Sequence, residues 1–253
     1  MTTVATLNIE ALEERTPFVN VLVYGEAGVG KTVFASTAPR PILWLDSEGG
    51  TASISDKKGI DVARVSGLDT YREAVDYLEA NPDTYQTVVF DSFTETQAHI
   101  LKGLMRKAKA LDPTRDEHLP QFDEYRVATG IMRAIIREFR DLPIHVVITA
   151  LQREDKDDLT GRVRIRPRLL PTFADELPGF LDAVLYLHAT TANKGEVDEE
   201  GIAADDEGVT VIRNALIKPT GKYAAKIRAP KGTDPPDFIT DPTFDNVAEL
   251  LGL

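Results

Sequence analysis

The chain has 253 residues, of which 42% are hydrophobic and 28% charged, a balance that excludes a collagen-like, low-complexity or wholly disordered protein. Its 29 basic and 41 acidic residues give a net charge of −12, which argues against a general DNA-coating protein but leaves room for a local basic strip. There is no cysteine, which excludes disulfides, thiolate metal sites and cysteine nucleophiles and fits a reducing cytoplasm. The sequence shows no signal peptide and no apolar run of ~20 residues, so no membrane partner is expected.

An N-terminal arm over residues 1–17 is predicted to precede a single domain over residues 18–253. The first part of this domain alternates short, β-branched apolar runs with segments of helical periodicity, a pattern that predicts a parallel sheet with helices on both faces. Strands are predicted at 18–24, 42–45, 61–65, 87–90 and 144–150, with helices from about Lys31, from Thr70, and in two long stretches between 93 and 139.

The pattern changes after Leu151. A polar, proline-containing segment covers 152–178, and an acidic loop with seven acidic residues against one lysine covers 193–208. Apolar runs at 181–188, 209–218 and 222–228 predict antiparallel strands that close the sheet, and 243–251 predicts a terminal helix.

The segment GEAGVGKT between the first predicted strand and its helix matches G-x-x-x-x-G-K-[ST]. Glycines let successive backbone amides point at one anion, and the helix N-terminus adds a partial positive charge. The lysine of such a loop reaches the β- and γ-phosphates, and the threonine hydroxyl is a Mg²⁺ ligand. The sequence therefore predicts an ATP and Mg²⁺ site at Gly25, Glu26, Ala27, Gly28, Val29, Gly30, Lys31 and Thr32. A glycine-rich turn with a chance lysine is the weaker alternative.

A second Mg²⁺ anchor in such proteins is an aspartate at the carboxyl end of a buried strand. Asp91 has this position after the run 87–90, and Asp46 is the other residue of the same form. Asp91 or Ser92 could instead cap the helix that follows. We favour the metal-linked role for Asp91, and the two roles are compatible.

Hydrolysis also requires a group that orients or deprotonates the attacking water. No glutamate follows Asp91 directly, and Glu48, two residues past the end of the strand at 42–45, is the alternative carboxylate. Carboxyl ends of parallel strands share one crevice, so Glu48 is expected to face Lys31 and Asp91. The competing interpretation is a solvated loop glutamate.

These segments resemble RecA-like recombinases and phage-type AAA-family nucleotide-binding proteins. PILWLDSEGG (41–50) resembles their second-strand motif, in which the glutamate is the catalytic base, and TVVFDS (87–92) resembles their Walker B strand. HVVITALQ (145–152) resembles a strand that ends in a γ-phosphate sensor. The resemblance leaves Thr149 or Gln152 as that sensor, and Gln152 is preferred.

KYAAKIR (222–228) resembles a late strand whose basic residues, here Lys226 and Arg228, reach a neighbouring subunit's ATP. The resemblance covers about residues 18–228 and implies a P-loop NTPase of RecA-like type. Its central sheet would be mostly parallel, with helices on both faces and antiparallel strands at the C-terminal end. Because no further domain is evident, the chain is similar to the short core-only recombination or single-strand-annealing ATPases of bacteriophages. This implies single-stranded DNA, a homo-oligomeric ring or filament and a single-strand-binding protein as partners, in the cytoplasm of a bacterial host.

Four arginines occur within seven residues of this acidic chain, at Arg162, Arg164, Arg166 and Arg168. Alternation in an extended segment would place three of them on one side, as a strip for backbone phosphates. The resemblance places single-stranded DNA at this loop. The equally weighted alternative is a charged edge strand whose arginines pair with Glu154, Asp155, Asp157 and Asp158.

Three functions remain open. The first is a DNA-stimulated ATPase that uses Lys31, Glu48 and Gln152 for catalysis. The second is a nucleotide-gated loader or scaffold with little turnover, which would be indifferent to Glu48→Gln. The third and least favoured is a P-loop kinase of small molecules, in which 152–178 would be the lid.

Overall fold

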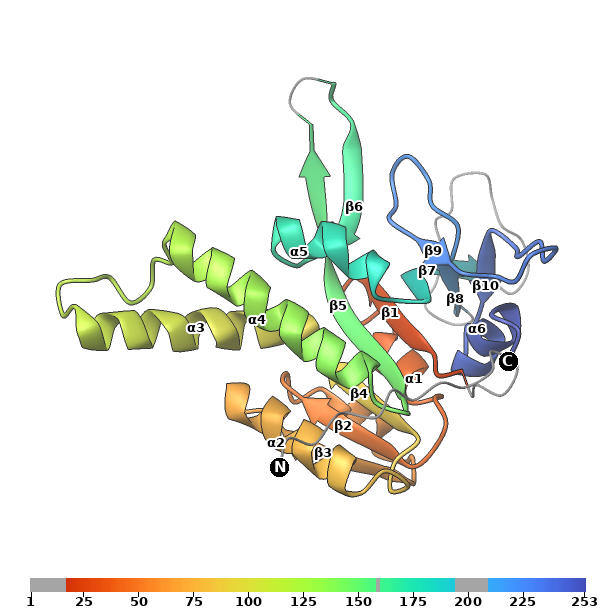
Figure 1. Cartoon of the computed structure of the whole chain (residues 1–253). Coiled ribbons are helices and arrows are strands. Elements are labelled where there is room, and N and C mark those ends of the chain that lie inside the picture. Colours follow the sequence, from red (N-terminus) through yellow and green to blue (C-terminus); the bar gives the residue numbers. More distant parts are fainter. Residues whose placement is uncertain (1–16, 158–159, 194–208) are drawn as a thin grey trace.

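The computed structural model describes residues 17–157, 160–193 and 209–253. Within these residues ten strands form one sheet with the order β10-β8-β7-β1-β5-β4-β2-β3, while β6 pairs with β5 and β9 pairs with β7 (Figure 1). The strands are β1 (Asn20–Gly25), β2 (Ile42–Asp46), β3 (Ile60–Arg64), β4 (Thr87–Asp91), β5 (His145–Lys156), β6 (Val163–Pro167), β7 (Ala183–Asn193), β8 (Val209–Leu216), β9 (Lys226–Ile227) and β10 (Phe238–Thr240). The helices are α1 (Lys31–Ala35), α2 (Leu68–Ala80), α3 (Phe93–Leu111), α4 (Phe122–Arg140), α5 (Pro171–Glu176) and α6 (Phe244–Leu250), with 3₁₀ turns at Thr51–Ile54 and Leu177–Gly179.

The middle of the sheet is parallel, as the alternating pattern predicted. β1 pairs in parallel with both β5 and β7, and β4 pairs in parallel with β5 and β2. Both faces are covered. Leu22 and Tyr24 pack into the core under α2, α3 and α4, while Val21 and Val23 pack into the core under α1 and α6. Strands buried on both faces need uninterrupted apolar runs, which explains why the sequence marks them clearly.

The C-terminal part adds antiparallel strands at one edge of the sheet. β7 pairs antiparallel with β8 and β9, and β8 pairs antiparallel with β10. The predicted fold class, α/β with a mostly parallel sheet, helices on both faces and antiparallel strands at the C-terminal end, is confirmed. The predicted strand at 222–228 is only the two-residue β9, and the predicted acidic loop lies almost wholly outside the described residues.

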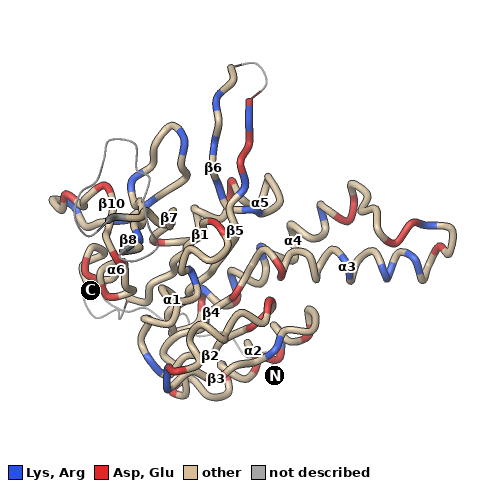
Figure 2. Tube along the Cα trace, turned by 180° about the vertical axis from the view of Figure 1, so that it is seen from behind, with Lys and Arg blue, Asp and Glu red and all other residues tan. Residues whose placement is uncertain are grey.

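Two extensions project from the body of the molecule in Figure 1. One is the helical hairpin of α3 and α4. The other is the hairpin of β5 and β6, in which β5 runs through Lys156 instead of ending near Ala150 as predicted, because β6 satisfies its backbone hydrogen bonds. Figure 2 shows basic residues along β6 and toward the far end of α3. No helix of the described residues is long and apolar enough to span a bilayer.

Candidate nucleotide-binding site

The loop between β1 and α1 has the backbone of an anion-binding turn. Gly28 and Gly30 have φ values of 78° and 106°, in the left-handed region that favours glycine. Gly25 is required for a different reason: a Cβ atom there would lie 2.2 Å from the carbonyl oxygen of Leu187 on β7. The sequence motif therefore reflects backbone geometry at three of its positions.

Lys31 is buried against this loop. Its ammonium donates hydrogen bonds to the carbonyl oxygens of Gly25 and Glu26, at 3.3 Å and 2.6 Å. Burial lowers the pKa of Lys31, and the negative charges of Glu48 and Asp91 oppose that shift. The predicted phosphate-binding cation and the two predicted carboxylates thus share one electrostatic environment.

Asp91 ends β4 and lies between two threonine hydroxyls. Thr32 donates to its Oδ2 at 3.0 Å, and Thr149 of β5 donates to its Oδ1 at 2.6 Å. Burial raises the pKa of Asp91, the two hydroxyls lower it, and the charges of Glu48 and Asp46 raise it further. The next peptide, to Ser92, is cis. Ser92 caps α3, so the predicted capping role falls to it and leaves the Asp91 carboxylate for the loop.

The oxygens of Thr32 and Asp91 form a donor set suited to Mg²⁺. Mg²⁺ prefers hard oxygen ligands and takes only one or two from protein when phosphates and water supply the others. The described part of the chain contains no group of three or more histidine, aspartate or glutamate side chains able to hold a metal by themselves. A hydroxyl and a carboxylate 3.0 Å apart beside a phosphate-binding loop fit the ion without such a group.

Glu48 lies in the turn that follows β2. Asp46 shapes this turn, because its Oδ1 accepts the amides of Glu48 at 3.1 Å and Gly49 at 2.6 Å, while its Oδ2 pairs with Arg64 at 3.4 Å. The Glu48 carboxylate accepts a hydrogen bond from the Ser92 hydroxyl. Glu48 is therefore held next to the end of β4, beside Asp91.

Ser47 also holds this turn in place, through contacts with β4, α2 and α3. Its amide donates to the Asp91 carbonyl at 2.8 Å, and its hydroxyl lies 3.3 Å from the Tyr71 hydroxyl of α2 and 3.4 Å from the Thr96 hydroxyl of α3. Tyr71 and Thr96 are themselves 2.6 Å apart. This buried hydroxyl cluster orients the backbone that carries Glu48.

The two sensor residues weighed from the sequence occupy different places. Thr149 contacts Asp91, as described above. Gln152 donates through Nε2 to the Glu26 carboxylate at 3.2 Å, and its Oε1 is buried without a hydrogen-bond partner among the described residues. Gln152 therefore contacts the phosphate loop directly, whereas Thr149 contacts Asp91.

The predicted trans-acting residues lie beside the beginning of β7, away from this cluster. Lys226 donates to the carbonyl oxygens of Pro178 and Leu181, and burial lowers its pKa. Arg228 pairs with Asp182 at 3.3 Å and donates to a backbone carbonyl. The chain does not bring either residue to its own phosphate loop, so their action on a neighbour stays a prediction.

The four arginines of the predicted DNA strip divide into two groups. Arg166 is half-buried and pairs with Asp155, as the charged-edge alternative expected, and also with Asp175, which that alternative did not name. Arg162, Arg164 and Arg168 are exposed on or beside β6. The structure therefore fits the charged-edge interpretation at Arg166 and leaves Arg162, Arg164 and Arg168 available for the predicted phosphate contact.

Arg213 of β8 is a residue of this site that sequence reasoning missed. A Cβ atom on Gly30 would lie 2.7 Å from its Nε and 2.9 Å from its Cδ, so its side chain lies directly against the loop. Its Nε is buried without a hydrogen-bond partner in the described part of the chain. Two hydrogen bonds to Asp241 fix the backbone of Arg213. The Asp241 carboxylate accepts a hydrogen bond from the Arg213 amide at 3.2 Å, and the Asp241 amide donates to the Arg213 carbonyl at 2.6 Å.

The AAA domain family matches residues 18–229 of the sequence. The chain belongs to this AAA domain family. The match begins two residues before β1 and ends two residues after β9, so it includes the phosphate loop, Asp46–Glu48 and Asp91. It makes the chain a P-loop protein of the AAA type, as the resemblance implied at the family level.

Among solved structures, the fold is similar to a KaiC-like protein from the hyperthermophilic archaeon Pyrococcus horikoshii OT3. The two share 12% sequence identity with a TM-score of 0.45, over 88% of this chain and 89% of that one. Among curated proteins, none matches the sequence significantly.

Proposed function

We propose that this AAA-family protein binds ATP with Mg²⁺ and hydrolyses it, and that it acts on single-stranded DNA in phage recombination or replication. The observation that supports hydrolysis is the convergence of Lys31, Asp91 and Glu48 at the carboxyl ends of β1, β4 and β2. A pocket that only bound nucleotide would not require the second carboxylate at 48.

In the proposed reaction Glu48 accepts a proton from the attacking water. The water oxygen forms a bond to the γ-phosphorus, the bond from that phosphorus to the β-γ bridging oxygen breaks, and the products are ADP and phosphate. The Ser92 hydroxyl donates to the Glu48 carboxylate and fixes its direction. Lys31 neutralises charge on the phosphates.

Thr32 and Asp91 are the residues that would hold Mg²⁺, which supplies charge neutralisation at the phosphates. Arg213 would add a cation from the same chain. Its Nε lies beside Gly30 and has no hydrogen-bond partner among the described residues, which supports a contact with the phosphate chain of the nucleotide. Gln152, at the edge of the loop, would sense the γ-phosphate.

The DNA part of the proposal rests on the projecting β5–β6 hairpin and its exposed arginines. A solvent-exposed strip of guanidinium groups binds a phosphate backbone without sequence preference. The resemblance to phage recombination ATPases supplies the choice of single-stranded DNA and of a bacterial cytoplasm.

The decisive test is ATP turnover of Glu48→Gln with and without single-stranded DNA. The amide keeps the shape of the side chain but cannot accept the proton, so kcat is expected to fall at least about 100-fold while ATP binding remains. Lys31→Ala is the companion variant, which should lose binding as well. A nucleotide-gated loader would instead show ATP binding, no DNA-stimulated phosphate release and no effect of Glu48→Gln.

A further inference from the structure

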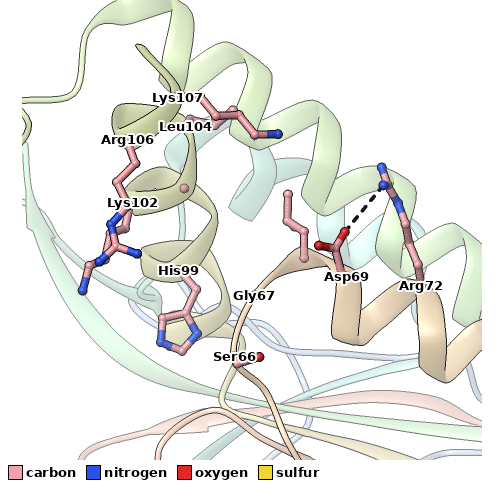
Figure 3. Close-up of a pocket in the computed structure, with 11 residues that line it drawn as sticks. Ser66, Gly67, Asp69, Arg72, His99, Lys102, Leu104, Arg106 and Lys107 are labelled. Carbon is pink, nitrogen blue, oxygen red and sulfur yellow. Dashed lines mark ion pairs between the residues drawn. The ribbon is translucent and has the colours of Figure 1, made fainter. Parts of the chain in front are cut away.

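A cavity lies between the beginning of α2 and the middle of α3 (Figure 3). It has a volume of about 330 Å³. None of the phosphate-loop residues lines it, and neither do Glu48 and Asp91. It is therefore separate from the nucleotide site.

The lining of this cavity is strongly basic. Arg72 of α2 and Lys102, Arg106 and Lys107 of α3 contribute four cations, against the single carboxylate of Asp69. Asp69 lies 3.9 Å from Arg72 (Figure 3). The three cations of α3 make no ion pair within the described part of the chain, in a protein whose net charge is −12.

This concentration of charge opposes helix stability. Lys102 and Arg106 are one helical turn apart, where like charges repel. No acidic residue occurs in α3 after Glu95, so the helix contains nothing that would compensate them. A bound anion would remove the repulsion.

Two glycines shape the walls of the cavity. Gly103, in the interior of α3, lines it, and a Cβ atom at this position would meet no atom within 4 Å. Packing thus does not require the glycine, although glycine disfavours a helix interior. Gly67 precedes α2 and provides no side-chain cap, which leaves first-turn amides of this 13-residue helix without a side-chain acceptor.

We propose that this cavity binds a small ligand that carries two or three phosphate groups. Three cations that have no ion pair among the described residues suit a multiply charged anion better than a ligand with one carboxylate. A pocket of about 330 Å³ that is bounded by two helices suits a compact ligand, whereas a nucleic-acid strand needs a groove that continues past the contact. Inorganic tripolyphosphate has the size and charge to act as the probe.

The test is calorimetric titration of tripolyphosphate into the full chain carrying Lys31→Ala, so that the phosphate loop contributes little. The double substitution Lys102→Gln and Arg106→Gln in this background should weaken binding at least about tenfold, because it removes two charge-assisted hydrogen bonds to the ligand. The matched control is Lys58→Gln with Lys231→Gln, two exposed lysines without an ion pair in the described residues, which changes net charge equally. It should bind within about twofold of the parent.

A steric variant tests the cavity without changing charge. Gly103→Phe should fill the space and abolish binding, while Gly103→Ala should retain it. Circular dichroism and thermal melting establish that both variants are folded. Binding that survives Gly103→Phe would overturn the proposal.

Three other results would also overturn it. One is absence of tripolyphosphate binding to the Lys31→Ala chain, and another is equal weakening by the two double substitutions. The third is that an oligothymidylate binds more tightly, per phosphate, than tripolyphosphate and depends on Lys102 and Arg106. That result would make this surface a binding site for a nucleic-acid strand. Because the titration reads binding at a site separate from the loop, a lack of ATP turnover would count against the proposed function alone.

Discussion

The residues around the phosphate loop differ in whether local sequence alone can predict their position. Lys31, Thr32, Glu48 and Asp91 occur in short segments whose sequence predicted that they would lie near one another, as they do, while their roles stay predictions. Arg213 was not predicted, because its position against Gly30 depends on the register of β8 on β7, where it lies opposite Ala189. That register is a tertiary property that no local pattern encodes.

Replacement of Arg213 should weaken nucleotide binding. Arg213→Met keeps much of the side-chain length but removes the cation, and without that charge the affinity for a fluorescent ATP analogue should fall about tenfold. Arg213→Lys, which retains the charge, should bind more tightly than Arg213→Met. Equal affinities of all three proteins would place the guanidinium outside the nucleotide contacts.

Asp91→Asn should increase stability while abolishing hydrolysis. Burial raises the pKa of Asp91 above its ordinary value of 3.8, which means that the folded protein binds this proton more tightly than the unfolded chain does. The carboxylate therefore destabilises the fold increasingly as pH rises from the unfolded pKa through the raised folded pKa. Asparagine cannot ionise, so Asp91→Asn should raise the free energy of unfolding at pH 7.5, and raise it by less at pH 4.5. Urea unfolding at both pH values measures it, and a gain independent of pH would contradict the pKa argument.

At the level of elements, the parallel half of the sheet was predictable and the β5–β6 hairpin was not. β1, β2 and β4 are buried along their whole lengths and appear as continuous apolar runs. Beyond Ala150, β5 leaves the core and becomes polar, so its hydrophobic pattern ends before its hydrogen bonding does. A strand stabilised mainly by its partner and by ion pairs such as Arg166–Asp155 has no apolar signature.

The hairpin makes a prediction about DNA binding. Arg162→Gln with Arg164→Gln should reduce affinity for single-stranded DNA and lower the slope of log K against log salt by about 0.7 for each phosphate that the protein no longer neutralises. Arg166 is left in place because it pairs with Asp155 and Asp175. Fluorescence anisotropy at several salt concentrations measures both quantities. The Lys58→Gln and Lys231→Gln protein serves as the charge-matched control, and an equal change in that protein would show that the hairpin has no specific role.

At the scale of the whole molecule, the phosphate loop is lined by Lys31 and Arg213 of its own chain. Arg228, whose side chain is 50% exposed, and the half-buried Lys226 lie away from the chain's own loop. If Arg228 completes a neighbour's site in a homo-oligomer, turnover per chain should rise with protein concentration, because only assembled chains have complete sites.

Mixing experiments distinguish this arrangement from an independent monomer. Arg228→Gln should lower kcat with little change in ATP affinity, whereas Lys31→Ala lacks a working loop but retains its arginine. A mixture of the two should therefore recover activity that neither has alone, since Lys31→Ala subunits supply Arg228 to intact loops. Lys226→Gln is a poorer variant, because its ammonium bonds the Pro178 and Leu181 carbonyls and its removal should destabilise the fold. Turnover that is independent of protein concentration, together with no recovery on mixing, would mean that each chain hydrolyses ATP with its own residues. In that case Arg213, whose side chain lies against Gly30 in the described part of the chain, would be the arginine that acts at the loop.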